Sequence, residues 1–401
     1  MHFQPICDDC KRSVGLEEMT CIKCSGKISF GYDKKSPIFD NSIKGLSRFW
    51  SRLPLVNPEQ RVSLGEGGTP LIKFELQGFS NLYIKNEMGN PTGSHKDRQL
   101  SIAISHAITL KKKISVLASA GSTGLANSAY AARAGIKSLV FTGSSARSDR
   151  VYPIHLLGAD VVTVKNADID QVLDVLTELC NELGVYHSST ARYINPYQAE
   201  GPKTISYEIF EELGHAPDWV IVPSGGGGTY ASMARGFVDL FESGLTDRIP
   251  RLIGSVPATY NAIEHGHNAG YTTMAQIKKH EIGFDVPTIL AKLAHIYPPD
   301  ADDALIMAKK VNGYFIGATD AESMDGSELL ASTVGLYAEP SSGNGVAALT
   351  KFLESGVPKS SDTIVVMACG SGFRETATVS ELRPFAPDKC ELSDIRKLIA
   401  E

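Results

Sequence analysis

The chain has 401 residues, more than one ordinary core holds, so we expect two packed domains and an appendage. With 42% hydrophobic and 21% charged residues, its composition is that of a globular protein. A net charge of −6 without a long basic run argues against a nucleic-acid partner, and no apolar stretch is long enough to span a bilayer. We expect no signal peptide and a cytoplasmic location.

Four of the seven cysteines form two close pairs near the start of the chain, Cys7 with Cys10 and Cys21 with Cys24. Two such C-x2-C pairs can surround one tetrahedral Zn²⁺ with four thiolates. Two disulfides are the alternative, but a large cytoplasmic protein holds few of them. The spacing therefore predicts a zinc site, and it is structural because no further ligand or open position is implied.

Beyond a polar segment the sequence predicts a connecting helix at 46–55, and then strands and helices alternate. Strands are expected at 82–85, 116–118, 138–141, 161–164, 219–222, 252–256 and 363–368. Helices are expected at 97–110, 123–134, 151–157, 169–183 and 230–241. Strands alternating with helices of this length indicate βαβ units and parallel sheet. Because the total exceeds one open sheet, we expect two α/β domains with a cleft between them.

Two segments carry features that one cofactor requires. Lys96 follows a Pro/Gly/Ser turn and opens an amphipathic helix, and a polyglycine turn at 224–229 follows a short apolar strand. Glycines let the backbone wrap an anion, and Thr229 adds a hydroxyl donor. A lysine amine with a separate phosphate cradle indicates pyridoxal phosphate, bound covalently to Lys96 through its aldehyde. The alternative interpretation of Lys96 is a solvated lysine at a helix start, and that of the glycine turn is a flexible loop.

Two further turns lie at the ends of predicted strands. The turn at 119–124 has small residues that leave backbone N–H groups at a helix start, where a carboxylate can bind. An ordinary capped turn fits this segment as well. The run Cys369-Gly370-Ser371-Gly372 follows the last strand and is a further candidate site turn. The alternative interpretation is a tight chain reversal without a binding role.

These motifs resemble those of threonine synthase and its relatives among the fold-type II pyridoxal-phosphate enzymes. The similarity runs from about residue 5 to 375 and includes the segments at 64–71, 86–98, 195–204 and 339–342. It implies two parallel-sheet α/β domains with the cofactor in the cleft, and a homodimer. The implied division is a zinc-ribbon-like segment at 1–45, a large cofactor-binding domain at 46–95 plus 205–385, a small substrate domain at 96–204, and a tail at 386–401.

The resemblance also implies a role for each site residue. Lys96 would hold the cofactor and then act as acid and base on the substrate carbons. The residues implied to bind the cofactor are Lys96, Ser122, Gly225, Gly226, Gly227, Gly228, Thr229 and Cys369. Among them Cys369 would face the ring nitrogen, with Ser371 as its competitor. The residues implied to bind the substrate are Ser119, Gly121, Ser122, Thr123 and Gln198.

Four residues of the expected site depart from the family's motifs: His95, Ser122, Gln198 and Ser371. Gln198 stands where the resemblance implies an arginine that binds the phosphate of O-phosphohomoserine, so we expect this substrate to bind poorly unless Lys203 or Arg98 supplies the positive charge. His95 titrates near neutrality when unperturbed, which makes it a candidate second acid or base. A packed, hydrogen-bonded histidine is the alternative.

The implied function is that of a pyridoxal-phosphate-dependent lyase or synthase, which eliminates a leaving group from a small amino acid and then adds a nucleophile. Formation of threonine from O-phosphohomoserine is the single reaction that the resemblance favours. The first alternative is β-elimination or β-replacement on serine, threonine or an O-activated serine. The second is a cofactor-binding scaffold without catalysis.

Overall fold

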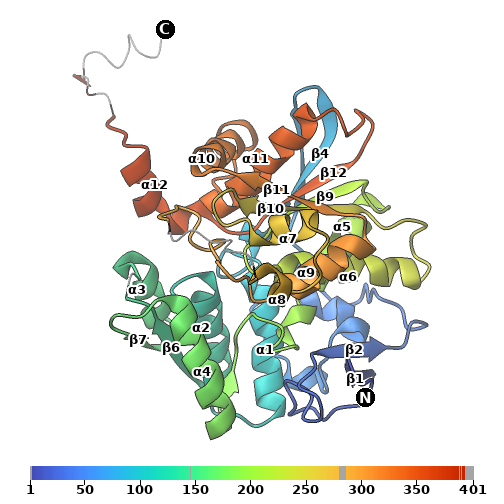
Figure 1. The fold of residues 1–401 in the computed structure, drawn as a ribbon. Helices are drawn as coiled ribbons and strands as arrows, with labels where there is room; N and C mark the ends of the chain where they lie inside the picture. Colours follow the sequence, from blue (N-terminus) through green and yellow to red (C-terminus); the bar gives the residue numbers. More distant parts are fainter. Residues whose placement is uncertain (1, 145, 280–285, 388, 390, 393–401) are drawn as a thin grey trace.

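The computed structural model describes residues 2–144, 146–279, 286–387, 389, 391 and 392. It contains a two-stranded sheet near the N-terminus, a four-stranded sheet and a six-stranded sheet. In Figure 1 the four-stranded unit, in green, lies below the strands and helices of the second half of the chain, in orange and red. The tail expected at 386–401 lies mostly outside the described residues.

The six-stranded sheet has the order β11-β10-β9-β12-β4-β3. Its neighbours are parallel except for the edge strand β3, which is antiparallel to β4. The strands are β3 (Leu71–Leu76), β4 (Phe79–Asn86), β9 (Trp219–Pro223), β10 (Arg251–Pro257), β11 (Tyr314–Ala318) and β12 (Ile364–Ala368). Four of the six were predicted; β3 and β11 were not.

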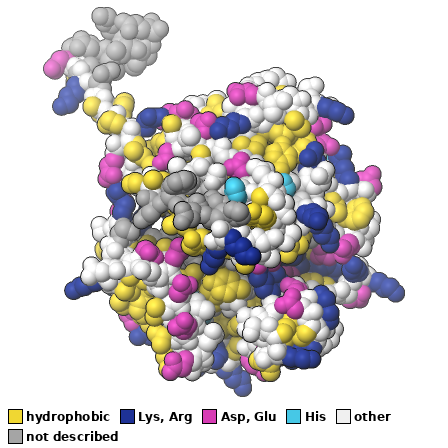
Figure 2. All heavy atoms as spheres, viewed as in Figure 1, with side chains coloured by type: hydrophobic (Ala, Val, Ile, Leu, Met, Phe, Trp, Pro, Cys, Tyr) yellow, Lys and Arg dark blue, Asp and Glu magenta, His cyan; other side chains and the backbone are white. Residues whose placement is uncertain are grey.

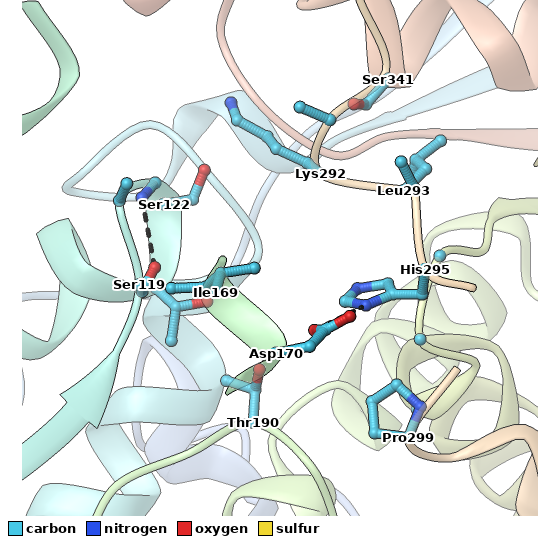
Figure 3. Close-up of a pocket in the computed structure, with 18 of the residues that line it drawn as sticks. Ser119, Ser122, Ile169, Asp170, Thr190, Lys292, Leu293, His295, Pro299 and Ser341 are labelled. Carbon is cyan, nitrogen blue, oxygen red and sulfur yellow. Dashed lines mark hydrogen bonds and ion pairs between the residues drawn. The ribbon is translucent and has the colours of Figure 1, made fainter. Parts of the chain in front are cut away.

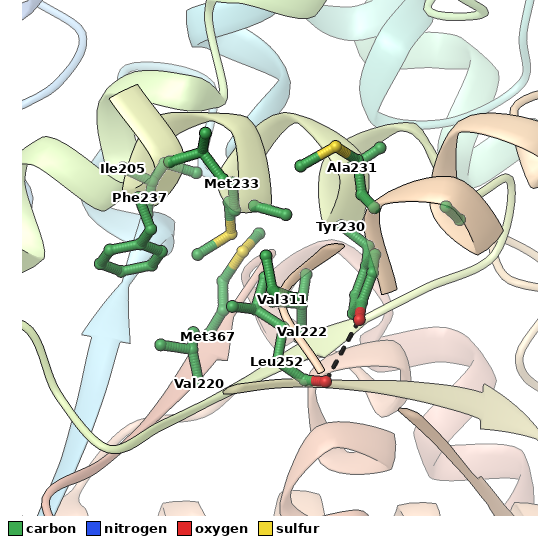
Figure 4. Packing of buried hydrophobic residues seen from close by; sticks show 14 of the residues in the cluster. Ile205, Val220, Val222, Tyr230, Ala231, Met233, Phe237, Leu252, Val311 and Met367 are labelled. Carbon is green, nitrogen blue, oxygen red and sulfur yellow. Dashed lines mark hydrogen bonds between the residues drawn. The ribbon is translucent and has the colours of Figure 1, made fainter. Parts of the chain in front are cut away.

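Both faces of this sheet are buried because successive residues of a strand point to opposite sides. Val220 and Val222 of β9 belong to one apolar cluster, whereas Ile221 belongs to the other. Figure 4 shows the first cluster, where Met233 and Phe237 of a covering helix pack on Val220 and its neighbours. The helices on that side are α5 (Lys203–Leu213), α6 (Gly228–Glu242) and α9 (Ala301–Lys310). The opposite face is covered by α11 (Pro340–Glu354), against which α10 (Asp320–Leu329) packs.

The four-stranded sheet is entirely parallel, with the order β7-β6-β5-β8. Its strands are β5 (Ile114–Ala118), β6 (Lys137–Thr142), β7 (Asp160–Thr163) and β8 (Tyr186–His187). Val116 packs on the helix α4 (Ile169–Leu183), and its neighbour Leu117 packs on α3 (Ser148–Leu156) on the other face. The helices α1 (Lys96–Thr109) and α2 (Ser122–Ala134) share a further cluster. The predicted alternation of strands and helices is confirmed here.

The segment expected as a connecting helix at 46–55 is a 3-10 helix, η1 (Gly45–Arg52), that ends before Pro54. The remaining short elements are η2 (Pro58–Gln60), η3 (Glu87–Gly89), η4 (Gln198–Glu200), the π-helical turn η5 (Leu330–Val334), η6 (Gly372–Arg374), α7 (Ala262–Asn268), α8 (Met274–Ile277) and α12 (Thr376–Leu382). The strands of the four-stranded sheet lie within 96–204, and those of the six-stranded sheet lie within 46–95 and 205–385. The domain boundaries themselves stay a prediction.

The N-terminal unit is an antiparallel pair, β1 (Phe3–Cys7) and β2 (Ile28–Tyr32), that packs on the rest of the molecule. The phenolic hydroxyl of Tyr32 donates to Glu200 at 2.7 Å, and the Phe30 and Tyr197 rings lie 4.8 Å apart. Basic and acidic side chains are interspersed on the face shown in Figure 2. Among the described residues, none of the helices combines the length and apolarity needed to cross a bilayer.

Candidate active site

The four turns singled out from the sequence all follow the carboxyl end of a parallel strand. The Lys96 turn comes after β4 and η3, the Ser119 turn after β5, the glycine turn after β9 and the Cys369 turn after β12. In open α/β sheets ligands bind at this edge. The turns line one cavity of about 610 Å³ between the two sheets, and Figure 3 shows part of its wall. The residues that the resemblance implies to bind cofactor or substrate all line it, except Gln198.

The glycine turn fits a phosphate group. Among the described residues, no partner is found for the backbone N–H groups of Gly225, Gly226 and Gly227, and the turn ends at the N-terminus of α6. Gly227 has φ of +89°, which favours glycine. A Cβ at Gly225 would lie 2.6 Å from the Cα of Leu293, so a side chain there would collide with backbone. Free N–H groups at a helix N-terminus are the usual donors to a phosphate.

Lys96 presents its amine to the same cavity. Burial lowers the pKa of this amine to about 8, although the acidic groups of Cys369, Asp300 and Glu339 oppose the shift. No hydrogen bond or ion pair to its Nζ is found within the described ranges. An amine with a lowered pKa and no counter-ion is suited to covalent attachment of an aldehyde. The residues of this chain therefore fit pyridoxal phosphate at both of its ends.

His95, beside Lys96, is a hydrogen-bonded histidine rather than a charged one. Burial, together with the charge of Lys96, lowers its pKa well below the usual value. Its Nδ1 lies 3.1 Å from the carbonyl oxygen of Cys369, and its Nε2 lies 3.3 Å from the hydroxyl of Thr229. Because a carbonyl only accepts, Nδ1 carries the proton and Nε2 accepts from Thr229. His95 thus connects the lysine turn to the glycine turn.

Cys369 lines the cavity as a neutral thiol. Burial, with the nearby carboxylate of Glu339, raises its pKa to about 12. Its Sγ lies 3.3 Å from the hydroxyl of Ser342 and 3.6 Å from a carboxylate oxygen of Glu339. Ser371 is not part of the cavity wall, and its hydroxyl accepts from the N–H of Phe373 at 3.3 Å. The geometry therefore favours Cys369 over Ser371 as the group that faces the cofactor ring.

The Ser119 turn leaves a helix start open. Helix α2 has Gly121 as its N-cap, with no side-chain cap hydrogen bond. The hydroxyl of Ser119 instead accepts from the N–H groups of Gly121 at 3.2 Å and Gly124 at 3.1 Å, which fixes the turn. Ser119 thus caps the Gly124 N–H of α2, whereas among the described residues no partner is found for the N–H groups of Ser122 and Thr123. These two groups lie at the positive end of the helix. A substrate carboxylate can bind there.

Three residues proposed from the sequence lie outside the cavity wall. Gln198 is buried, accepts from Gln99 at 2.6 Å and donates to the carbonyl of Thr190 at 3.0 Å, so it can influence the cavity only through these two wall residues. The idea that Arg98 or Lys203 supplies charge to the substrate is not supported, because both are buried in ion pairs elsewhere. The sequence motifs that contain Arg98 and Lys203 did not indicate these ion pairs.

The cavity wall contains three cations that the sequence analysis missed: Arg147, Arg150 and Lys292. The two arginines lie in or just before α3, and Lys292 lies in the segment that precedes α9. Lys292 contacts Glu339 at 2.5 Å and Glu375 at 2.6 Å. Burial alone would raise the pKa of Glu339, but Lys292 and Arg374 outweigh it and hold that pKa below its usual value.

The four N-terminal cysteines converge. Their sulfur atoms all lie within 4.8 Å of one another, and none of the four is in a disulfide. Cys7 lies 3.5 Å from Cys24, and Cys10 lies 3.6 Å from Cys21. This arrangement disfavours the two-disulfide alternative and matches the donor set of a tetrahedral metal site.

The fold and the cavity together define a pyridoxal-phosphate enzyme of fold type II, with a lysine amine and a phosphate cup at one cleft. The family described as "Pyridoxal-phosphate dependent enzyme" matches residues 62–370, so the chain belongs to that family. It is similar to threonine synthase of Methanocaldococcus jannaschii, with 30% identity over 98% of this chain and 99% of that protein. Threonine synthase of Methanosarcina acetivorans is 29% identical over 94% of this chain and 93% of its own length. The chain is a lyase-type enzyme of the threonine-synthase kind.

Solved structures show the same fold. A fungal L-serine ammonia-lyase from Rhizomucor miehei superposes with a TM-score of 0.65 at 20% identity, covering 79% of this chain and 97% of that one. An O-ureido-L-serine synthase superposes with a TM-score of 0.63 at 18% identity, covering 83% of this chain and 96% of the other. At this identity the likeness concerns the fold alone. The predicted fold class is confirmed.

Proposed function

We propose that this enzyme converts O-phosphohomoserine to threonine and phosphate. The observation that carries the proposal is one shared cavity, in which the Lys96 amine, the N–H groups of the glycine turn and the free N–H groups at the start of α2 meet. Its volume of about 610 Å³ accommodates a cofactor together with a small amino acid. The relatives named threonine synthase, similar over nearly the whole chain, support the choice of substrate.

The bound cofactor supplies an electron sink that stabilises negative charge next to the substrate's amino group. The start of α2 binds the substrate carboxylate and so orients the α-carbon toward Lys96. The Nζ of Lys96 would remove and return protons at the substrate carbons. Cys369, held as a neutral thiol, would offer the cofactor ring a partner without a full negative charge.

Two features outside the chemical step belong to the same proposal. The convergent thiols of the N-terminal unit would hold one structural Zn²⁺. The family resemblance supports a cytoplasmic homodimer and a division into a large domain, which binds the cofactor, and a small domain at 96–204.

One observation favours a second candidate function, β-elimination or β-replacement on serine, threonine or an O-activated serine. The position at which the family resemblance implies a phosphate-binding arginine is Gln198, and its side chain does not reach the cavity. Substrates without a distal phosphate would not need that arginine.

The test uses the purified holoenzyme with each candidate amino acid. We expect stoichiometric release of phosphate and formation of threonine from O-phosphohomoserine, with little 2-oxoacid from serine, threonine or O-phosphoserine. Oxoacid formation from the serine compounds, without threonine formation, would assign the enzyme to β-chemistry. A full cofactor complement with no turnover of any of these compounds would point to the scaffold alternative.

A further inference from the structure

The positive charge of the cavity wall is concentrated on one side. Arg150 of α3 and Lys292 share the carboxylate of Glu375, and Lys292 and Arg374 share that of Glu339. Three cations thus surround two carboxylates, which leaves one positive charge in this cluster without a counter-ion. Arg147 is different, because Glu381 and Asp149 already bind it near the surface.

The cluster keeps two N–H donors that its ion pairs do not use. The ammonium of Lys292 has three N–H groups, of which Glu339 and Glu375 take one each. Within the described part of the chain, the buried Nε of Arg150 has no hydrogen-bond partner. A buried N–H without a partner costs roughly 1–3 kcal/mol, so a ligand oxygen that reached it would be favoured.

Lys292 also lies beside the start of α2. Its Cε is 3.8 Å from the position that a Cβ on Gly121 would take, at the start of α2. Figure 3 shows its side chain extended from the opposite wall toward the turn that holds Ser119 and Ser122. An amino acid whose carboxylate occupies that turn therefore has the Lys292 ammonium as a neighbour.

We propose that Lys292 and Arg150 form the subsite that binds an anionic group, a phosphate or a phosphonate, at the end of the substrate's side chain. The inference rests on the proposed function for the identity of the phosphate ester, and it assigns to these two residues the charge that Gln198 cannot provide. A dianion needs cationic donors, and charge-assisted hydrogen bonds are the strong ones. The cavity wall offers such donors here while Arg98 and Lys203 remain outside it.

The experiment compares two ligands that differ only in the anion. One is the phosphonate isostere of O-phosphohomoserine, in which a methylene replaces the ester oxygen. The other is norvaline, which has the same carbon chain without the phosphonate. Dissociation constants are measured from the cofactor absorbance of the holoenzyme and of Lys292→Met, Lys292→Arg and Arg150→Gln. The matched control is Lys310→Met, whose lysine is on the surface, away from the cavity.

We expect Lys292→Met to weaken phosphonate binding by about tenfold to a hundredfold, while norvaline binding changes less than about threefold. Lys292→Arg should recover much of the loss. Arg150→Gln should also weaken phosphonate binding more than norvaline binding, so this variant tests the proposal even if Lys292→Met does not fold. Equal losses for both ligands would mean that Lys292 only supports the wall, and would overturn the proposal. So would a wild-type enzyme without preference for the phosphonate.

The two proposals fail in different ways. If wild-type enzyme prefers the phosphonate but releases no phosphate from O-phosphohomoserine, the subsite stands and the proposed reaction falls. If it forms threonine efficiently and Lys292→Met and Arg150→Gln retain the same kcat/KM, the reaction stands and the subsite falls.

Discussion

At the scale of single residues, the site depends on a lysine whose environment changes its chemistry. The turn that precedes Lys96 places the amine in a partly buried cavity, and burial lowers its pKa to about 8. An ordinary lysine titrates near 10.4. At pH 7 about a tenth of the Lys96 amine is then neutral, against roughly one part in 2,500 for an ordinary lysine. Only the neutral form attacks an aldehyde.

We therefore predict that the rate at which apoenzyme captures pyridoxal phosphate rises with pH and levels off above about 8, because most of the Lys96 amine is neutral above that pH. Cofactor absorbance after mixing measures this rate. Borohydride should fix the label on Lys96, and Lys96→Ala should bind no cofactor covalently. A midpoint near the ordinary lysine value would contradict the predicted environment.

Residues in local motifs were predictable, whereas those defined by long-range partners were not. Lys96 and Gly225 to Gly228 were found because a turn before a helix and a glycine run between strand and helix have direct physical meanings. Arg98 was misjudged because its partners Glu87 and Glu208 lie 11 and 110 positions away along the chain. Lys292 and Arg150 were missed since no motif surrounds them.

At the scale of elements, alternation of strands and helices was enough to predict most of the parallel sheet. The exceptions have physical reasons. β3 is an antiparallel edge strand whose polar residues Lys73 and Glu75 weaken its apolar pattern, and β11 is a short strand next to a glycine-containing turn. β3 belongs to no βαβ unit, whereas β11 lies between α9 and α10, and neither of those helices was predicted from the sequence.

The N-terminal unit is connected to the cofactor site by one arginine. Arg192 donates to Ser29 at 2.7 Å and to the carbonyl of Ile28 at 2.9 Å. Its backbone N–H donates to Asp300 at 2.8 Å, and the Asp300 N–H donates to the carbonyl of Gly226 in the glycine turn, also at 2.8 Å. The folding of the cysteine unit thus supports the turn from behind.

We predict that the double variant Cys7→Ser, Cys10→Ser loses close to one zinc per chain, has a lower thermal midpoint and retains the cofactor less tightly. The cysteine unit has a small apolar cluster of its own, so the metal would supply much of its stability. Metal analysis, calorimetry and cofactor titration measure the three effects. At saturating cofactor most of kcat should remain. An unchanged metal content, or loss of the chemical step with full cofactor, would be the contrary result.

At the scale of the whole molecule, a buried ion cluster fastens helix α1, which carries the cofactor lysine, to the large sheet and its helices. The guanidinium of Arg98 donates to Glu87 at 2.7 and 2.8 Å and to Glu208 at 2.7 Å through each of two nitrogens. Lys85 of β4 lies 3.1 Å from Glu208. All four side chains are fully buried, so each charge depends on its neighbours.

We predict that Arg98→Met lowers the free energy of unfolding by about 3–5 kcal/mol, because it removes the cation paired with buried Glu87 and leaves buried Glu208 with Lys85 alone. Arg147→Met is the matched control. Its arginine bridges α3 and Glu381 at the surface, where an ion pair contributes about 0–1 kcal/mol. Urea unfolding followed by tryptophan fluorescence measures both, and the folded fraction of Arg98→Met should bind the phosphonate isostere as tightly as wild type. An unchanged urea midpoint together with a raised dissociation constant for that ligand would return Arg98 to the substrate site.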